Sequence, residues 1–209
     1  MTPLPSAAAA GLKFGPLGPR AVHIAVDMQV LFAPGSDWGT AATAVITPMV
    51  AALADHAPQR TIFTRFICPP TADHANGQWR TFYRHWPSVL GDRNNPSLYD
   101  LVEPLRRFVP PARVVDKPTY SAYEVPAFQA AIAELAADTL IFSGVETDCC
   151  VLATAFTAMD RGMRVIVATD AVASGSVRSH AATLSHLYPR FDQQIELTDT
   201  ATILKAWTP

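Results

Sequence analysis

The sequence has few charged side chains and no excess of either sign. Only 16% of its 209 residues are Asp, Glu, Lys or Arg, and the 16 basic residues against 18 acidic ones give a net charge of −2. Binding of nucleic acid or of an anionic membrane surface needs clustered positive charge, which this balance does not favour. We therefore expect small-molecule partners, with no nucleic acid and no membrane.

The N-terminal region lacks the features of a targeting segment. Residues 1–20 contain no basic stretch before their alanine run, and prolines interrupt them. Neither a secretory signal nor a membrane span fits this pattern, so we expect a cytoplasmic protein. The abundance of Pro, Gly and Ala predicts an N-terminal arm over residues 1–20. Residues 21–209 are then long enough for one domain with a single core.

Cysteine is also scarce, with Cys68, Cys149 and Cys150 as its three occurrences. An odd number without zinc-ribbon spacing, two of them adjacent, argues against a disulfide framework and favours free thiols. Free cysteines often pack as small hydrophobic residues, which is the simplest interpretation of Cys68.

Short apolar runs alternate with helical patterns along most of the chain. Continuous apolar runs predict strands buried on both faces, and they occupy residues 21–28, 60–66, 112–116, 138–145 and 164–171; residues 193–199 form a plausible sixth and last strand. Helical patterns follow at residues 40–57, 125–137, 151–162, 176–188 and 200–207. This order predicts an α/β fold: a single-domain, doubly wound open sheet of about six mainly parallel strands with helices on both faces.

The segment from Cys68 to Pro111 departs from this rhythm. It carries Trp79, Trp86, several prolines and a turn-like stretch "GDRNNPS". Connections of this length are usually functional, so we expect this insertion to contribute to a binding site.

Ligands of such sheets bind beyond the carboxyl ends of the strands, where three reactive side chains are expected. Asp27 follows the stretch "AVHIAV" (21–26) of the first run, and Lys117 follows the third run. Taken alone, Asp27 is best explained as a capping residue and Lys117 as a surface lysine. Cys149 and Cys150 lie where a helix begins after the fourth run.

The helix start gives the cysteine pair a physical reason for reactivity. Its partial positive charge favours a thiolate, and its free N–H groups can bind an oxyanion. A nearby lysine would lower the thiol pKa further, and an aspartate could move a proton between thiol and leaving amine. Consecutive helical positions point about 100° apart, so only one cysteine can face the site. The pattern alone does not choose between Cys149 and Cys150.

Three stretches resemble the motifs of the isochorismatase-like cysteine hydrolases, a family that includes nicotinamidases and N-carbamoylsarcosine amidases. They are "VDMQVLF" (26–32), "DKPTYSAYE" (116–124) and "GVETDCCVLATA" (144–155). The resemblance runs from about Ala21 to the end of the chain and is most specific in the third stretch.

The resemblance implies a catalytic triad of Asp27, Lys117 and Cys150, with Cys149 in a variable position. Backbone N–H groups of Glu146 and Cys150 would hold the oxyanion, and the Val145–Glu146 peptide bond would be cis. The implied activity is cysteine-dependent hydrolysis of a small amide, carbamoyl or ureido C–N bond through a thioester. Alternatives are an isochorismatase-type vinyl ether hydrolase and a non-catalytic binding protein on the same fold.

Further expectations concern the substrate, metals and assembly. Substrate-binding candidates are Gln29, Phe32, Tyr120 and Thr147, followed by Trp38, Trp79 and Trp86; His180 is interpreted as structural. Nicotinamidases of the family hold a divalent ion through an aspartate and histidines after the second strand. Asp73, His74 and His85 do not match that spacing, so we expect neither a catalytic metal nor a cofactor. Relatives are often oligomers with pockets partly closed by a neighbour, so we expect a homo-oligomer.

Overall fold

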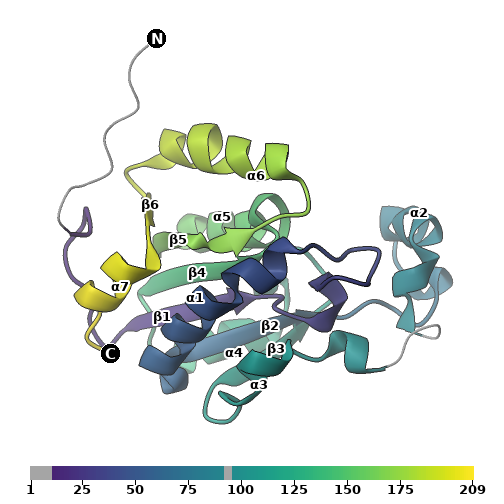
Figure 1. Cartoon of the computed structure of the whole chain (residues 1–209), viewed down its shortest axis with the longest axis horizontal. Coiled ribbons are helices and arrows are strands. Elements are labelled where there is room, and N and C mark those ends of the chain that lie inside the picture. The colour runs from purple at the N-terminus through teal and green to yellow at the C-terminus, as the bar shows by residue number, and fades with distance from the viewer. Residues whose placement is uncertain (1–10, 92–95) are drawn as a thin grey trace.

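The computed structural model describes residues 11–91 and 96–209, which form one six-stranded sheet (Figure 1). The strand order is β3-β2-β1-β4-β5-β6, and every neighbouring pair is parallel. The strands are β1 (Ala21–Val26), β2 (Thr61–Phe66), β3 (Arg113–Lys117), β4 (Thr139–Val145), β5 (Arg164–Ala173) and β6 (Ile195–Thr198). This topology confirms the predicted doubly wound open sheet.

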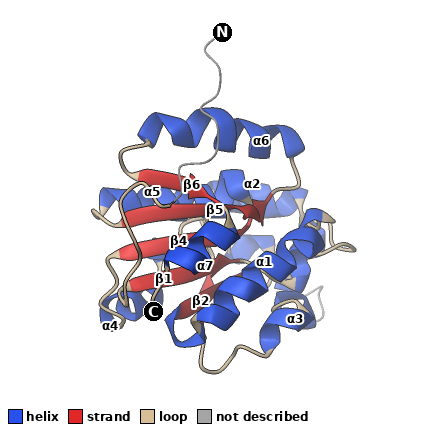
Figure 2. Cartoon of the chain, turned by 60° about the vertical axis from the view of Figure 1, so that its left-hand side comes forward, coloured by secondary structure: helices blue, strands red, loops and turns tan. Residues whose placement is uncertain are grey.

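Helices cover both faces of the sheet. Figure 2 shows α1 and α7 in front of the strands and α4 and α5 behind them. β1 and β4 are buried at every position, which explains their uninterrupted apolar sequences. The helices are α1 (Ala42–His56), α4 (Pro126–Glu134), α5 (Leu152–Asp160), α6 (Val177–Ala182) and α7 (Thr200–Ala206).

The insertion between β2 and β3 contains two helices that the sequence pattern did not predict. They are α2 (Gln78–His85) and the short α3 (Glu103–Arg106). Figure 1 shows α2 at the right, past the ends toward which the strands point. Tyr83 is buried in the core, whereas the other residues of α2 are at least partly exposed. The insertion thus places one amphipathic helix at the edge where ligands of such sheets bind.

Part of the predicted N-terminal arm belongs to the packed structure. Leu17 is buried and pairs with Trp207 near the C-terminus. Its N–H donates to the carbonyl of Ala206 at 2.9 Å, and its carbonyl accepts from Thr208 at 2.9 Å. The segment from Lys13 to Leu17 is thus held against the domain, by the Lys13–Asp192 ion pair as well as by these bonds, while residues 1–10 of the predicted arm lie outside the described residues. No helix among those described is both long and apolar enough to cross a bilayer.

Candidate active site

Three chain segments that are distant in sequence bring an acid, an amine and a thiol together at one edge of the sheet. Asp27 directly follows β1, Lys117 ends β3, and Cys150 lies in the helical turn Thr147–Val151 between β4 and α5. The ammonium Nζ of Lys117 donates to Asp27 Oδ2 at 2.7 Å and to the carbonyl of Thr119 at 2.9 Å. The side chains of both Asp27 and Lys117 are fully buried.

The backbone at the end of β1 orients the carboxylate of Asp27. Asp27 has a φ of 51°, in the left-handed region that aspartate tolerates better than most residues. Its N–H donates to the carbonyl of Thr64, and its Oδ1 accepts from the hydroxyl of Thr64 at 2.6 Å. The carboxylate is therefore held between Thr64 on β2 and Lys117 on β3.

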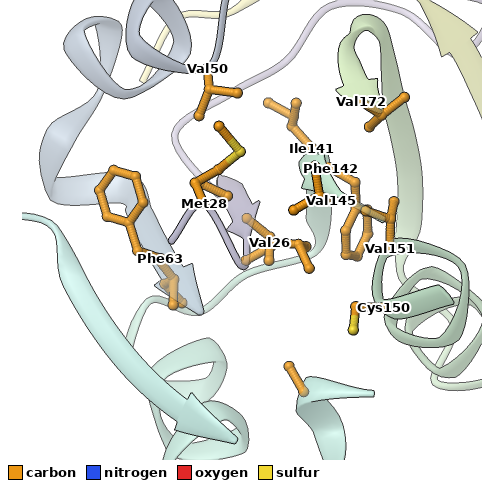
Figure 3. Close-up of a cluster of buried hydrophobic side chains, with 14 of the residues drawn as sticks. Val26, Met28, Val50, Phe63, Ile141, Phe142, Val145, Cys150, Val151 and Val172 are labelled. Carbon is orange, nitrogen blue, oxygen red and sulfur yellow. The ribbon is translucent and has the colours of Figure 1, made fainter. Parts of the chain in front are cut away.

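The thiol of Cys150 lies where the apolar core meets an open cavity. Figure 3 shows its sulfur pointing away from Phe142, at the border of the core cluster. Burial raises the pKa of the Cys150 thiol well above its ordinary value, and the negative charge of Asp27 raises it further, while Lys117 acts in the opposite direction. The expectation that the helix start and the lysine would lower this pKa is corrected, because desolvation is the larger effect.

Lys117 shows the opposite balance between burial and charge. Burial alone would lower its pKa, but Asp27 and Cys150 together raise the pKa above the usual lysine value. At neutral pH and without substrate, the Cys150 thiol is therefore neutral and lies beside the ion pair of Asp27 and Lys117.

The turn that carries Cys150 starts at the peptide bond between Val145 and Glu146, which is cis as the motif resemblance implied. The carbonyl of Glu146 accepts hydrogen bonds from the N–H groups of Cys149 and Val151, at 3.0 and 3.1 Å. Cys149 is half-buried, and burial together with Asp148 and Glu146 raises the pKa of its thiol to about 12. Both thiols of the pair are therefore neutral at rest.

A cavity of about 420 Å³ opens onto Cys150. Six aromatic side chains dominate its walls, and two carboxylates lie among them. The lining residues are Phe32, Asp37, Trp38, Gly39, Phe66, Phe82, Trp86, Tyr120, Glu146, Cys149, Cys150 and Gly175. An apolar hollow of this size with a few polar groups is typical of a small-molecule site.

The structure places two of the four predicted substrate-binding residues in this lining, Phe32 and Tyr120, together with the further candidates Trp38 and Trp86. Trp79 packs behind Tyr120, with ring centroids 4.9 Å apart.

Gln29 and Thr147 are not in the lining, because their side chains are hydrogen-bonded to other residues of the protein. Gln29 is fully buried; its amide accepts from the N–H of Phe66 and donates to the carbonyls of Phe66 and Tyr99. The Thr147 hydroxyl is hydrogen-bonded to His180 Nδ1 at 2.9 Å. Both residues brace the loops that carry Asp27 and Cys150 and do not face the cavity.

Sequence analysis did not single out Asp37, Phe66, Phe82 or the side chain of Glu146 as part of the site. Phe66 ends β2, so the strand-end rule could have found it. Asp37 and Phe82 come from the β1–α1 loop and from α2, whose positions depend on long-range packing.

The residues considered for a metal do not fit one. Asp73 pairs with Arg84 at 3.1 Å, and His74 Nδ1 is hydrogen-bonded to the hydroxyl of Thr71 at 2.8 Å. His85 packs edge-on against Trp86. In residues 11–91 and 96–209, no three potential ligands converge. The donor set therefore does not match a divalent ion, and no chemical step below uses one.

Comparisons with known proteins agree with this geometry. Residues 21–200 match the family profile described as the isochorismatase domain. An uncharacterized isochorismatase family protein PncA of Bacillus subtilis is 35% identical over 112 residues, 52% of this chain and 61% of that protein. Nicotinamidase 3 of Arabidopsis thaliana is 36% identical over 77 residues, 37% of this chain and 39% of that protein. Both matches span less than two thirds of the relatives' own lengths.

Solved structures match over almost the whole chain. A cysteine hydrolase from Pseudomonas syringae superposes with a TM-score of 0.76 at 25% identity, covering 95% of this chain and 98% of that one. N-carbamoylsarcosine amidase from Thermoplasma acidophilum has a TM-score of 0.68 at 18% identity, covering 87% and 96% of the two chains. The second likeness concerns the fold alone.

Proposed function

The chain belongs to the isochorismatase family, and on that premise we propose that it is a cysteine-dependent hydrolase of a small amide, carbamoyl or ureido C–N bond. The observation that carries the proposal is the buried ion pair of Asp27 and Lys117 beside the thiol of Cys150. The cavity opens onto the thiol, and the buried carboxylate and ammonium lie next to that thiol, so the three groups supply a nucleophile, an acid-base group and a cation.

In the first half of the reaction the neutral thiol is activated only as it attacks. The sulfur of Cys150 forms a bond to the carbonyl carbon while its proton passes to Asp27, and the carbonyl π electrons move onto oxygen. The positive charge of Lys117 stabilises the negative charge that develops on sulfur. Backbone N–H groups of Glu146 and Cys150 are proposed to stabilise the oxyanion. Asp27 then gives the proton to the leaving nitrogen as the C–N bond breaks, which releases ammonia or an amine.

The second half releases the acid. A water molecule loses a proton to Asp27 as its oxygen attacks the thioester carbon. The C–S bond breaks, and the departing sulfur of Cys150 takes the proton back from Asp27. In each half of the reaction Asp27 thus accepts one proton and then donates it. At the end the neutral thiol and the Asp27–Lys117 ion pair are restored.

The test compares two neighbouring cysteines. Ammonia release should be measured on a panel of small amides and ureides for the wild-type protein, Cys150→Ala and the matched control Cys149→Ala. We expect Cys150→Ala to lower kcat by at least about 10³-fold, and Cys149→Ala to retain most of the activity.

Mass spectrometry of acid-quenched reactions should detect an acyl adduct on Cys150 in the wild-type protein. An adduct on Cys149, or unchanged turnover in Cys150→Ala, would rule out the proposed nucleophile. Hydrolysis of a vinyl ether probe that survives alkylation of Cys150 would instead fit the vinyl ether mechanism, which needs no thiol.

A further inference from the structure

The cavity at Cys150 carries negative charge that no described residue of its lining neutralises. Asp37 and Glu146 line it, and among the described lining residues there is no Lys, Arg or His. Lys117 contributes no free charge here, because its Nζ is bound to Asp27 and to the carbonyl of Thr119 and its side chain is fully buried. The walls of the cavity therefore present acidic groups and aromatic rings.

Among the described residues, neither carboxylate has a cationic partner. Asp37 accepts a hydrogen bond from the hydroxyl of Ser88, and Glu146 Oε1 accepts one from the N–H of Gly175 at 2.8 Å. The donors of these bonds are uncharged, so they hold the carboxylates in place without neutralising them. In the described part of the chain, neither residue forms an ion pair, whereas Asp27 and Glu196 are paired with Lys117 and Arg164.

The aromatic side chains form a connected wall around these charges. Trp38 lies next to Asp37 in the chain, and its ring centroid is 6.0 Å from Phe32, 5.7 Å from Phe66 and 5.6 Å from Phe82. Tyr120 lies on the same lining as Glu146; burial raises the pKa of its phenol, and the charge of Glu146 adds a smaller contribution. Faces of aromatic rings attract cations, and the attraction grows when the cation is desolvated.

We propose that the substrate is a small amide or ureide whose non-reacting part is a compact cation, such as a substituted ammonium group. This inference rests on the proposed hydrolase function and adds the substrate class. The aromatic walls enclose the cation, and Asp37 and Glu146 supply the opposite charge. A substrate that carries a carboxylate would meet two like charges in the cavity with no basic group in the described lining to offset them.

The test uses three probes that differ mainly in charge. Betaine amide carries a trimethylammonium group, 3,3-dimethylbutanamide is its uncharged isostere, and malonamate is a small anion. Binding to the full-length Cys150→Ala variant should be measured by calorimetry, so that no turnover is needed. We expect the dissociation constant of betaine amide to be at least about tenfold lower than that of the isostere, and malonamate to bind more weakly than either.

Two further variants locate the charge effect. Asp37→Asn, made in the Cys150→Ala background, should reduce the preference for betaine amide over its isostere by about fivefold. The matched control is Asp73→Asn, because Asp73 is exposed, pairs with Arg84 and does not line the cavity. It should leave the preference unchanged. Added salt should weaken binding of the cation but not of the uncharged isostere.

Several results would overturn the inference: equal or tighter binding of the isostere, tighter binding of malonamate, a preference that survives Asp37→Asn, or no binding of any probe. None of these depends on the thiol. Acyl-adduct detection on Cys150 tests the proposed function separately, so the two failures are distinguishable.

Discussion

At the scale of single residues, burial decides the charge states of the groups at the carboxyl edge of the sheet. The thiol of Cys150 stays neutral because desolvation outweighs the attraction of Lys117, and Lys117 stays charged because the negative charge of Asp27 offsets its desolvation. Asp27 and Lys117 are each buried only because the other is present. Removal of one partner would leave an uncompensated charge in a low-dielectric interior.

The first prediction concerns that ion pair. Lys117→Met should lower the free energy of unfolding by about 3 to 5 kcal/mol, because it strands the charge of Asp27. The double variant Asp27→Asn/Lys117→Met should be more stable than Lys117→Met alone. Arg113→Met is the matched control, since its pair with Glu134 is exposed and should be worth less than about 1 kcal/mol. Urea unfolding measures all three. A double variant less stable than the single one would contradict the argument.

A second prediction concerns His23, which is fully buried in β1. Its Nε2 is hydrogen-bonded to Ser143 at 2.7 Å, and burial lowers its pKa from 6.5 to about 3. Between these values the unfolded chain binds a proton at His23 that the folded protein does not. Proton binding by the unfolded chain lowers the free energy of unfolding. The full stability is therefore present above pH 6.5, and part of it is lost as the pH falls toward 3.

Lowering the pH from 6.5 to 4 should therefore remove on the order of 3 kcal/mol of unfolding free energy through His23. The variant His23→Gln keeps a polar side chain but does not titrate, so its stability should depend less on pH over this range. Urea unfolding at several pH values measures the difference between the two proteins. Parallel pH profiles would show that His23 does not carry the effect.

At the scale of elements, the site depends on the close approach of β1 and β4. Gly144 lies one residue before the end of β4, with a φ of +104°. A Cβ at this position would lie 2.0 Å from the carbonyl oxygen of Val26, the residue before Asp27. Only glycine lets the two strands that carry Asp27 and Cys150 lie this close.

The third prediction follows from this contact. Gly144→Ala should lower the free energy of unfolding by more than about 3 kcal/mol or prevent folding, because backbone would have to move. Gly162→Ala is the matched control: Gly162 also has a positive φ, of +77°, but nothing lies within 4 Å of its added Cβ. It should cost only about 1 kcal/mol. Thermal unfolding compares the two, and equal losses would mean that strain alone, without the Val26 contact, explains both.

Elements were predictable to different degrees. The six strands and the helices after them follow from local periodicity, which is why their order could be predicted from the sequence. The helix α2 was not predicted: its eight residues, "QWRTFYRH", are mostly polar and only Tyr83 is buried. A helix with so narrow an apolar face is stabilised by the packing around it more than by its own pattern.

At the scale of the whole molecule, the two ends of the described chain hold each other in place. Trp207 is 3% exposed, packs against His56 of α1 and pairs with Leu17. Leu17 and Trp207, far apart in the sequence, thus pack together as part of the core.

The fourth prediction tests this packing. Trp207→Ala should lower the free energy of unfolding by about 3 to 5 kcal/mol, because it removes a large side chain from a packed position. Val45→Ala serves as the control, since Val45 is 68% exposed and should change stability by less than about 0.5 kcal/mol. Calorimetric melting of both variants provides the comparison. A melting temperature of Trp207→Ala close to that of the wild type would show that the ends contribute little.

The sequence by itself determined the order of strands and helices and which polar residues follow the strands, because both depend on short-range patterns. Parallel strands then bring their carboxyl ends to one edge, so Asp27, Lys117 and the Cys149–Cys150 pair could be expected together, and only the motif resemblance selected Cys150 from that pair. Only the tertiary structure decided that the Cys150 thiol is neutral, that Gln29 and Thr147 face away from the cavity, and that Asp37 and Phe82 line it. Desolvation and side-chain direction are set by neighbours that are far away in the chain, and no local pattern encodes them.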